Sequence, residues 1–105
     1  MADFSKIMEQ AAQMQARMQQ MQSELEKLTV TAAAGGGMVI VEADGKGTVT
    51  RVKIDPSVAD PKDVEMLEDL VLVAVNETQK KAAELAKTEM SRLTGGLNLP
   101  FKLPF

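Results

Sequence analysis

The stretch GGGMVIVEADGKGTVTRVKIDP, residues 35–56, decides the fold of this chain. Two runs rich in β-branched residues flank the pair Asp44-Gly45, and this pattern is a strong short-range signal for a β-hairpin. Glycine takes positive φ at little cost and aspartate tolerates it, so a two-residue turn is expected there. Such a turn predicts three cross-strand pairs: Ala43 with Lys46, Val41 with Thr48, and Val39 with Thr50.

The predicted hairpin carries apolar side chains on both faces. One face holds Val39, Val41, Thr48, Thr50, Val52 and Ile54. The other holds Met38, Ile40 and Val49 beside the charged residues Glu42, Arg51 and Lys53. A sheet of this kind needs two covers. We expect the flanking helical segments to supply one and a second copy of the chain the other, with five candidate dimer-interface residues: Met38, Ile40, Val49, Val39 and Val41.

Composition limits the possible functions of the chain. Its 105 residues predict one domain with a single small core. The chain has no Cys, His, Trp or Tyr, which excludes disulfides, thiolate metal sites and the usual general base and thiol nucleophile. The longest apolar run, residues 70–75, is far too short to cross a bilayer. We therefore expect a cytoplasmic protein that is not an enzyme and holds no metal or cofactor.

A long first helix is predicted before the glycines, starting after a candidate N-cap at Asp3 or Ser5. Its apolar residues alternate at spacings of three and four, which is the heptad pattern of a narrow packing seam. The seam consists of Phe4, Ile7, Ala11, Met14, Met18, Met21, Leu25 and Leu28. Its methionines favour adaptable packing, with a ligand groove as the alternative. Residues 29–33 then predict a first short strand, so that three strands form an antiparallel meander.

A second long helix is predicted from Pro61 to Leu93, because Asp60-Pro61 places an N-cap before a proline at the first helical position. A break near residues 76–79 is the alternative to one continuous helix. The segment LNLPFKLPF, residues 97–105, contains two prolines and cannot be helical, so it is either mobile or laid in an apolar groove.

Two glycine-rich segments raise the question of a phosphate-binding loop. Neither residues 35–37 nor residues 45–48 shows the Gly-x4-Gly-Lys-Ser/Thr pattern that such a loop requires. We interpret both as turn or bulge glycines.

Charge is unevenly distributed along the chain, whose formal net charge is −3. Residues 55–76 carry a local charge of −5, whereas residues 77–105 carry +2. The acidic segment lies at a helix N-terminus, where carboxylates are favoured, so its structural role is preferred over a metal or partner site. The basic segment is either a solvated helix end or a nucleic-acid contact. The candidate DNA-binding residues are Lys80, Lys81, Lys87 and Arg92, with Lys6, Arg17 and Lys27 as lesser candidates.

The order of these features resembles the YbaB/EbfC nucleoid-associated proteins of bacteria. The resemblance covers almost the whole chain as a single domain, residues 1–105. It rests on MQARMQQMQSELEKL at 14–28, AGGGMVIV at 34–41, VKIDPS at 52–57, EMLEDLVLVAVNET at 65–78, and the ending LPFKLPF.

The resemblance implies an α+β fold with the order α-β-β-β-α and a homodimer through the central sheets, with long helices projecting like the arms of tweezers. It also implies a DNA-binding protein of the nucleoid without catalytic activity. Few aromatic residues and no obvious recognition helix favour weak, sequence-tolerant binding of duplex DNA. The alternative function is a protein-interaction module that binds a replication or recombination partner.

Overall fold

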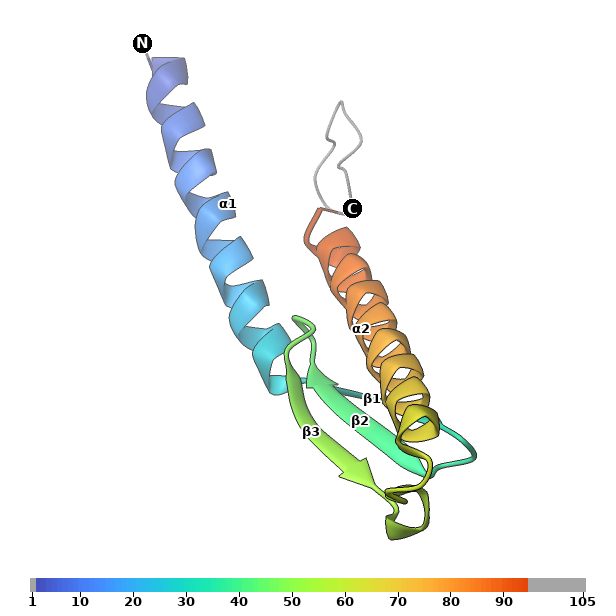
Figure 1. Cartoon of the computed structure of the whole chain (residues 1–105). Coiled ribbons are helices and arrows are strands. Elements are labelled where there is room, and N and C mark those ends of the chain that lie inside the picture. The colour runs from blue at the N-terminus through green and yellow to red at the C-terminus, as the bar shows by residue number, and fades with distance from the viewer. Residues whose placement is uncertain (1, 95–105) are drawn as a thin grey trace.

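Three antiparallel strands at one end of two long helices make up this protein (Figure 1). The computed structural model describes residues 2–94. Its elements are α1 (Ala2–Lys27), β1 (Thr29–Ala34), β2 (Val39–Asp44), β3 (Val49–Ile54), the 3-10 turn η1 (Pro56–Val58) and α2 (Val64–Thr94). The strand order is β1-β2-β3, and both helices extend from the sheet in the same general direction. This architecture confirms the predicted α+β fold and its α-β-β-β-α order. The predicted tail, residues 97–105, lies outside the described residues.

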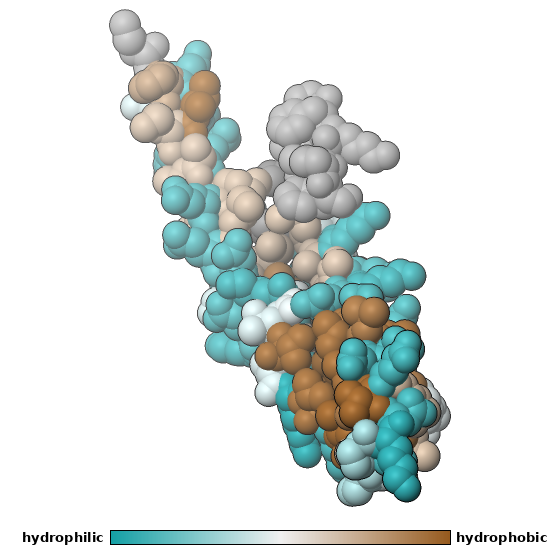
Figure 2. All heavy atoms as spheres, viewed as in Figure 1, coloured by the Kyte–Doolittle hydropathy of each residue, from teal (hydrophilic) through white to brown (hydrophobic). Residues whose placement is uncertain are grey.

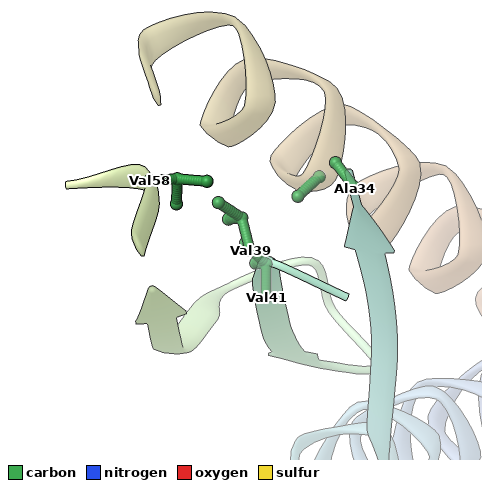
Figure 3. Packing of buried hydrophobic residues seen from close by; sticks show 5 residues of the cluster. Ala34, Val39, Val41 and Val58 are labelled. Carbon is green, nitrogen blue, oxygen red and sulfur yellow. The ribbon is translucent and has the colours of Figure 1, made fainter. Parts of the chain in front are cut away.

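The hydrophobic core forms where α2 lies across β1 and β2. Val39 and Val41 of the central strand and Ala74 of α2 are all 0% exposed. Small residues on this side of α2 let the helix axis approach the strands closely, so that the valines fill the space between them. Figure 3 shows Val58 of η1 pointing toward Val39 and Ala34 lying beneath the helix. The core is thus built on the inner side of the sheet by a single helix.

A buried hydroxyl joins α2 to the central strand. Thr78 is 0% exposed, and its Oγ1 lies 2.7 Å from the carbonyl oxygen of Ala74 and 3.2 Å from that of Val41. The hydroxyl has one proton to donate, which the two acceptors share. Thr78 lies in the segment where a break had been considered as the alternative. The helix runs through this segment without interruption.

The start of α2 differs from the prediction by a few residues. Asp60 accepts a hydrogen bond from the backbone N–H of Lys62 and so closes a turn before the helix. Asp63 instead caps the helix by accepting from the N–H of Met66 at 3.2 Å. Its short polar side chain meets one of the unpaired amides of the first turn. The predicted cap at Asp60 was therefore wrong by three residues.

The predicted register of the hairpin was also wrong. Ala43 pairs with Val49, not with Lys46, and the connection is longer than two residues. The carboxylate of Asp44 explains the longer loop, because its Oδ1 accepts hydrogen bonds from the N–H groups of Lys46 (2.9 Å) and Thr48 (3.1 Å). This side chain organises the turn by its own acceptors, as aspartate commonly does. The observed pairs further along the hairpin are Glu42 with Arg51, Val41 with Val52, Ile40 with Lys53, and Val39 with Ile54.

A β-bulge between Glu42 and Ala43 changes which side chains share a face. It turns Val49 toward the core, where it packs against the buried cluster. The predicted place of Val49 on the outer face was therefore wrong, because the extra residue in β3, Thr50, moves Val49 to the opposite face. Val52 and Ile54 lie on the face that was predicted for them. The outer face around Ile40 is charged: Ile40 pairs with Lys53 across the strands and shares a shallow hollow with Glu42, Arg51 and Lys53.

The excess of apolar surface lies on the inner side of β3. Val52 and Ile54 are partners of buried residues of β2 and share their side of the sheet, yet they are 45% and 38% exposed. Since α2 covers β1 and β2, these two side chains have no helix above them. Figure 2 shows the most hydrophobic side chains of the molecule gathered over the sheet and the first half of α2.

The loop between β2 and β3 is held against the end of α1. The N–H of Gly45 donates to the carbonyl oxygen of Leu25 at 2.8 Å. A Cβ atom at Gly45 would lie only 2.7 Å from that same oxygen, so a glycine is required here for close approach. Positive φ occurs at Gly47 (+93°) and not at Gly45, contrary to the two-residue turn that was predicted.

Substitution of Gly45 tests this contact. We expect Gly45→Ala to lower the free energy of unfolding by about 2–3 kcal/mol, because the methyl group must displace the backbone of α1. Gly47→Asn is the control, since nothing lies within 4 Å of its Cβ position and asparagine tolerates positive φ. We expect the free energy of unfolding of the control, measured in urea, to fall by about 1 kcal/mol or less. Equal destabilisation of the two variants would show that the loop can retreat from α1.

Among the described residues, α1 packs against the rest of the protein through its second half. Met21 and Leu25 are buried against Met90 of α2. By contrast, Phe4 and Ile7 are 68% and 60% exposed. Within residues 2–94, the heptad seam predicted from the sequence is thus covered in the second half of α1 and exposed in its first half.

This uneven packing predicts uneven amide exchange. We expect the amides of residues 7–14 to exchange at least about tenfold faster than those of residues 18–27, because an uncovered helical segment opens locally at low cost. Hydrogen–deuterium exchange with residue resolution measures the difference. Uniformly slow exchange along α1 would show that another segment or chain covers the whole seam.

Candidate nucleic-acid interface

A groove with a volume of about 620 Å³ lies between the end of α1 and the second half of α2. Its lining is mostly apolar, and the residues that contribute to it are Met18, Met21, Gln22, Leu25, Lys46, Lys80, Ala83, Glu84, Ala86, Lys87 and Met90. The groove lies beside the contact in which Met21 and Leu25 of α1 pack against Met90 of α2. Three lysines and one glutamate among these residues make its local charge positive.

Lys80 and Lys87 enter this lining from the same side of α2. They are seven residues apart, which is two helical turns or about 10 Å along the axis. Both are exposed, and no hydrogen bond or ion pair joins either ammonium group to the residues that the structure describes. Their charges are therefore available to an external anion.

Lys46 also lines the groove, although it was not among the DNA-binding residues predicted from the sequence. It sits in the β2–β3 loop, which the Gly45 amide fixes to the end of α1. Its Nζ lies 3.0 Å from Glu26 Oε1 in a partly exposed ion pair. The sequence around Lys46 was tested only against the pattern of a phosphate-binding loop. The contact that places Lys46 beside the groove joins the β2–β3 loop to α1, which is distant in sequence, so no local pattern predicts it.

The other predicted basic residues do not gather around this groove. Lys81 reaches across the sheet and donates from Nζ to the carbonyl oxygen of Thr31 at 2.9 Å. Lys6 lies in the exposed half of α1, and Lys27 is its last residue.

Arg17 and Arg92 line a second hollow of about 280 Å³, together with two glutamates. There Arg92 Nη1 pairs with Glu89 Oε1 at 3.3 Å. The two arginines therefore occupy a region of balanced charge, whereas the lining of the larger groove carries more lysines than glutamates.

Comparison with known proteins identifies the class to which this arrangement belongs. The model of the YbaB/EbfC DNA-binding family matches residues 1–97. The chain belongs to the YbaB/EbfC DNA-binding family. This confirms the resemblance inferred from the sequence motifs.

Relatives from distant bacteria share this family resemblance. A nucleoid-associated protein of Gemmatimonas aurantiaca is 52% identical over 103 residues, covering 98% of this chain and 99% of the relative. A nucleoid-associated protein of Gluconacetobacter diazotrophicus is 50% identical over 105 residues, covering 100% of this chain and 98% of the relative. Among solved structures, the uncharacterized protein HP0035 from Helicobacter pylori matches with a TM-score of 0.80 and 26% identity, covering 88% of this chain and 97% of that one.

The five predicted dimer-interface residues of this YbaB/EbfC chain occupy different environments. Val39 and Val41 are 0% exposed beneath α2 and present no surface to a second copy. Val49 is half-buried against the same core. Met38 is 38% exposed and Ile40 is half-buried on the outer face of the sheet. Met38, Ile40 and Val49 therefore retain surface that a partner could contact, whereas Val39 and Val41 do not.

The acidic segment before α2 has structural partners. Hydrogen bonds from Ser57, first from its side chain and then from its backbone N–H, lower the pKa of Asp55. Asp60 and Asp63 accept backbone hydrogen bonds in the same way. Within residues 2–94, no three acidic side chains converge in a geometry that could hold a metal ion. Neither helix, over the described part of the chain, is long and apolar enough to cross a membrane.

Proposed function

We propose that this chain is a homodimeric DNA-binding protein of the bacterial nucleoid, in the cytoplasm, with no catalytic activity. The match of the YbaB/EbfC DNA-binding family over residues 1–97 carries this proposal. The lysines of the groove supply a contact surface for phosphates. A chain without His or Cys also lacks the side chains most often used for acid–base and thiol chemistry.

Local charge, not net charge, attracts DNA in this proposal. The chain has a formal net charge of −3, so its whole surface does not favour a polyanion. Lys80 and Lys87 lie on the distal half of α2, roughly 25 Å or more along the helix from the acidic cap at Asp63. This separation exceeds the Debye length of about 8 Å at physiological salt, so the repulsion from the cap is screened. Duplex DNA therefore contacts the distal half of α2 and not the sheet and the acidic start of α2.

Binding through lysines to phosphates is expected to tolerate different sequences. Phosphate contacts position a protein on DNA but carry no direct information about base sequence. Lysine ammonium groups act as point charges and do not impose the planar geometry that reads a base pair. The complex should therefore depend strongly on salt and only weakly on sequence.

A second copy of the chain is proposed to cover the exposed apolar surface of the body. Val52 and Ile54 on β3 lie beside an uncovered edge of the core, and Leu72 of α2 is 59% exposed. A chain of 105 residues has no further described element to cover them. A twofold-symmetric contact buries such a patch against itself and also presents each lysine groove twice. Doubling the lysine contacts strengthens binding without raising the charge of one chain.

The DNA contact is tested with the double variant Lys80→Gln/Lys87→Gln. We expect its affinity for unrelated duplexes to fall by a similar factor in each case. The slope of log K against log salt should flatten by about one unit for each phosphate that the variant no longer neutralises. Fluorescence anisotropy at several salt concentrations measures both quantities.

The matched control is Lys53→Gln/Lys62→Gln, which removes the same charge from exposed lysines outside the groove. If the control weakens binding as much as the groove variant, net charge and not the groove attracts DNA.

The dimer is tested with Val52→Asp in light scattering and sedimentation. We expect the dissociation constant of the dimer to rise by about a hundredfold, because the carboxylate would be buried without a partner. Ile7→Asp on the exposed half of α1 is the control and should leave the dimer intact. Ile40→Asp separates the two sides of the sheet, since dissociation by this variant alone would place the contact on the outer face. A parent chain that stays monomeric at micromolar concentration would refute the dimer.

Binding of a replication or recombination protein is the second candidate function. It is favoured by the free half of α1, where Phe4, Ile7 and Met8 are each at least 59% exposed. Such a row of apolar side chains on one helix is typical of a helix that docks on a partner. Pull-down with and without nuclease distinguishes the candidates, because a protein partner stays bound after the DNA is digested.

A further inference from the structure

The groove between α1 and α2 has a floor that is more apolar than DNA binding requires. Met18, Met21, Leu25, Ala86 and Met90 contribute to it, and only its rim is charged. DNA phosphates would contact the charged rim, so the apolar side chains of the floor would stay exposed to water. A volume of about 620 Å³ matches the size of sites that bury several apolar groups of a ligand. An apolar segment is therefore the chemically matched occupant.

The chain itself supplies such a segment after the end of α2 in the sequence. Residues 97–105, LNLPFKLPF, contain three leucines, two phenylalanines and two prolines with a single charge at Lys102. They follow α2 after Gly95-Gly96, a pair that allows the backbone to reverse its direction. We propose that residues 97–105 fold back along α2 and bind in the groove of the same chain. This inference goes beyond the proposed DNA binding and does not rest on it.

The length of the segment is sufficient for this path. From Thr94 back to Lys80 the distance along α2 is roughly 21 Å at the standard helical rise. Residues 95–105 can span up to about 36 Å when extended, at roughly 3.3 Å per residue. The reversal consumes part of this reach and still leaves enough to cover the groove.

The chemistry of the segment also fits the lining. The two prolines prevent a helix and remove two backbone N–H groups, so an extended strand of leucine and phenylalanine side chains has fewer donors to satisfy. Methionine side chains are unbranched and polarizable, so they adapt to such irregular partners. At the rim, Glu84 can pair with Lys102, while Lys80 and Lys87 can donate to backbone carbonyls of the segment.

The absence of tryptophan and tyrosine makes a single fluorophore decisive. In the full chain, Phe101→Trp should show blue-shifted emission and several-fold weaker acrylamide quenching than Phe4→Trp, whose site is 68% exposed. Adding Ala83→Glu in the groove to the Phe101→Trp variant should restore strong quenching, whereas adding Ala12→Glu, at an exposed alanine outside the groove, should not. Circular dichroism confirms that each variant is folded.

Equal quenching at the two tryptophan sites would overturn the proposal. Protection that Ala83→Glu does not change would also overturn it, because the segment would then lie elsewhere.

A spin label tests whether the segment belongs to the same chain. The sequence has no cysteine, so Gln22→Cys in the groove accepts one label at a unique site. We expect the label to broaden the NMR signals of residues 97–105 within its own chain. It should not broaden them when labelled chains are mixed with isotope-enriched, unlabelled ones. Broadening only in the mixture would assign the groove to the segment of a second copy and overturn the intrachain proposal.

Discussion

The carbonyl oxygen of Leu25 fixes the position of α1 relative to the rest of the protein. It accepts hydrogen bonds from the N–H groups of Leu28 and Gly45, at 3.1 and 2.8 Å. The first bond ends the helix, and the second joins that end to the loop of the sheet. A helix end leaves its last carbonyls without partners in the helix, so a backbone donor from the loop is well matched to this place. The direction of α1, the groove beside it and the position of Lys46 all depend on this junction.

A second fixed point lies on the other side of the groove, where α2 crosses the central strand. Valines of β2 and small residues of α2 exclude water there, and the Thr78 hydroxyl reaches the strand through this dry contact. Because the two helices are attached to the sheet at different places, the space between them depends on the sheet as well as on the contact of Met21 and Leu25 with Met90. This explains how two amphipathic helices can remain apart beyond that contact.

The order of elements could be predicted from the sequence because each has its own local signal. The heptad spacing in α1 and the β-branched runs around Asp44 do not depend on distant residues. The hairpin register could not be predicted in the same way. It depends on which amides the Asp44 carboxylate accepts from and on a bulge after Glu42, and neither has a signal in the pattern of apolar residues. A shift of one residue then moved Val49 to the core and left the outer face charged.

The candidate site could likewise be predicted from the sequence only in part. Lys80 and Lys87 could be selected from helical spacing and local charge, and the structure brings them together. Lys46 comes from a segment far away in sequence, so only the fold places it beside them. Lys81 and Arg92 have the same charge and similar sequence context, yet each has a protein partner. Which lysines are free depends on neighbours that the local sequence does not specify.

Because α1 is attached to the rest of the protein near its C-terminal end, a small rotation there displaces its N-terminal end by a larger distance. Residues 2–17 extend about 24 Å beyond the packed contact that begins at Met18. A rotation of only about 10° at the junction moves the far end by roughly 4 Å, since displacement grows with distance from the pivot. The width of the opening between the arms is therefore adjustable at small structural cost, and methionines at the pivot can repack as it changes. In the proposed complex, such an adjustment would let the arms accommodate duplexes of different curvature.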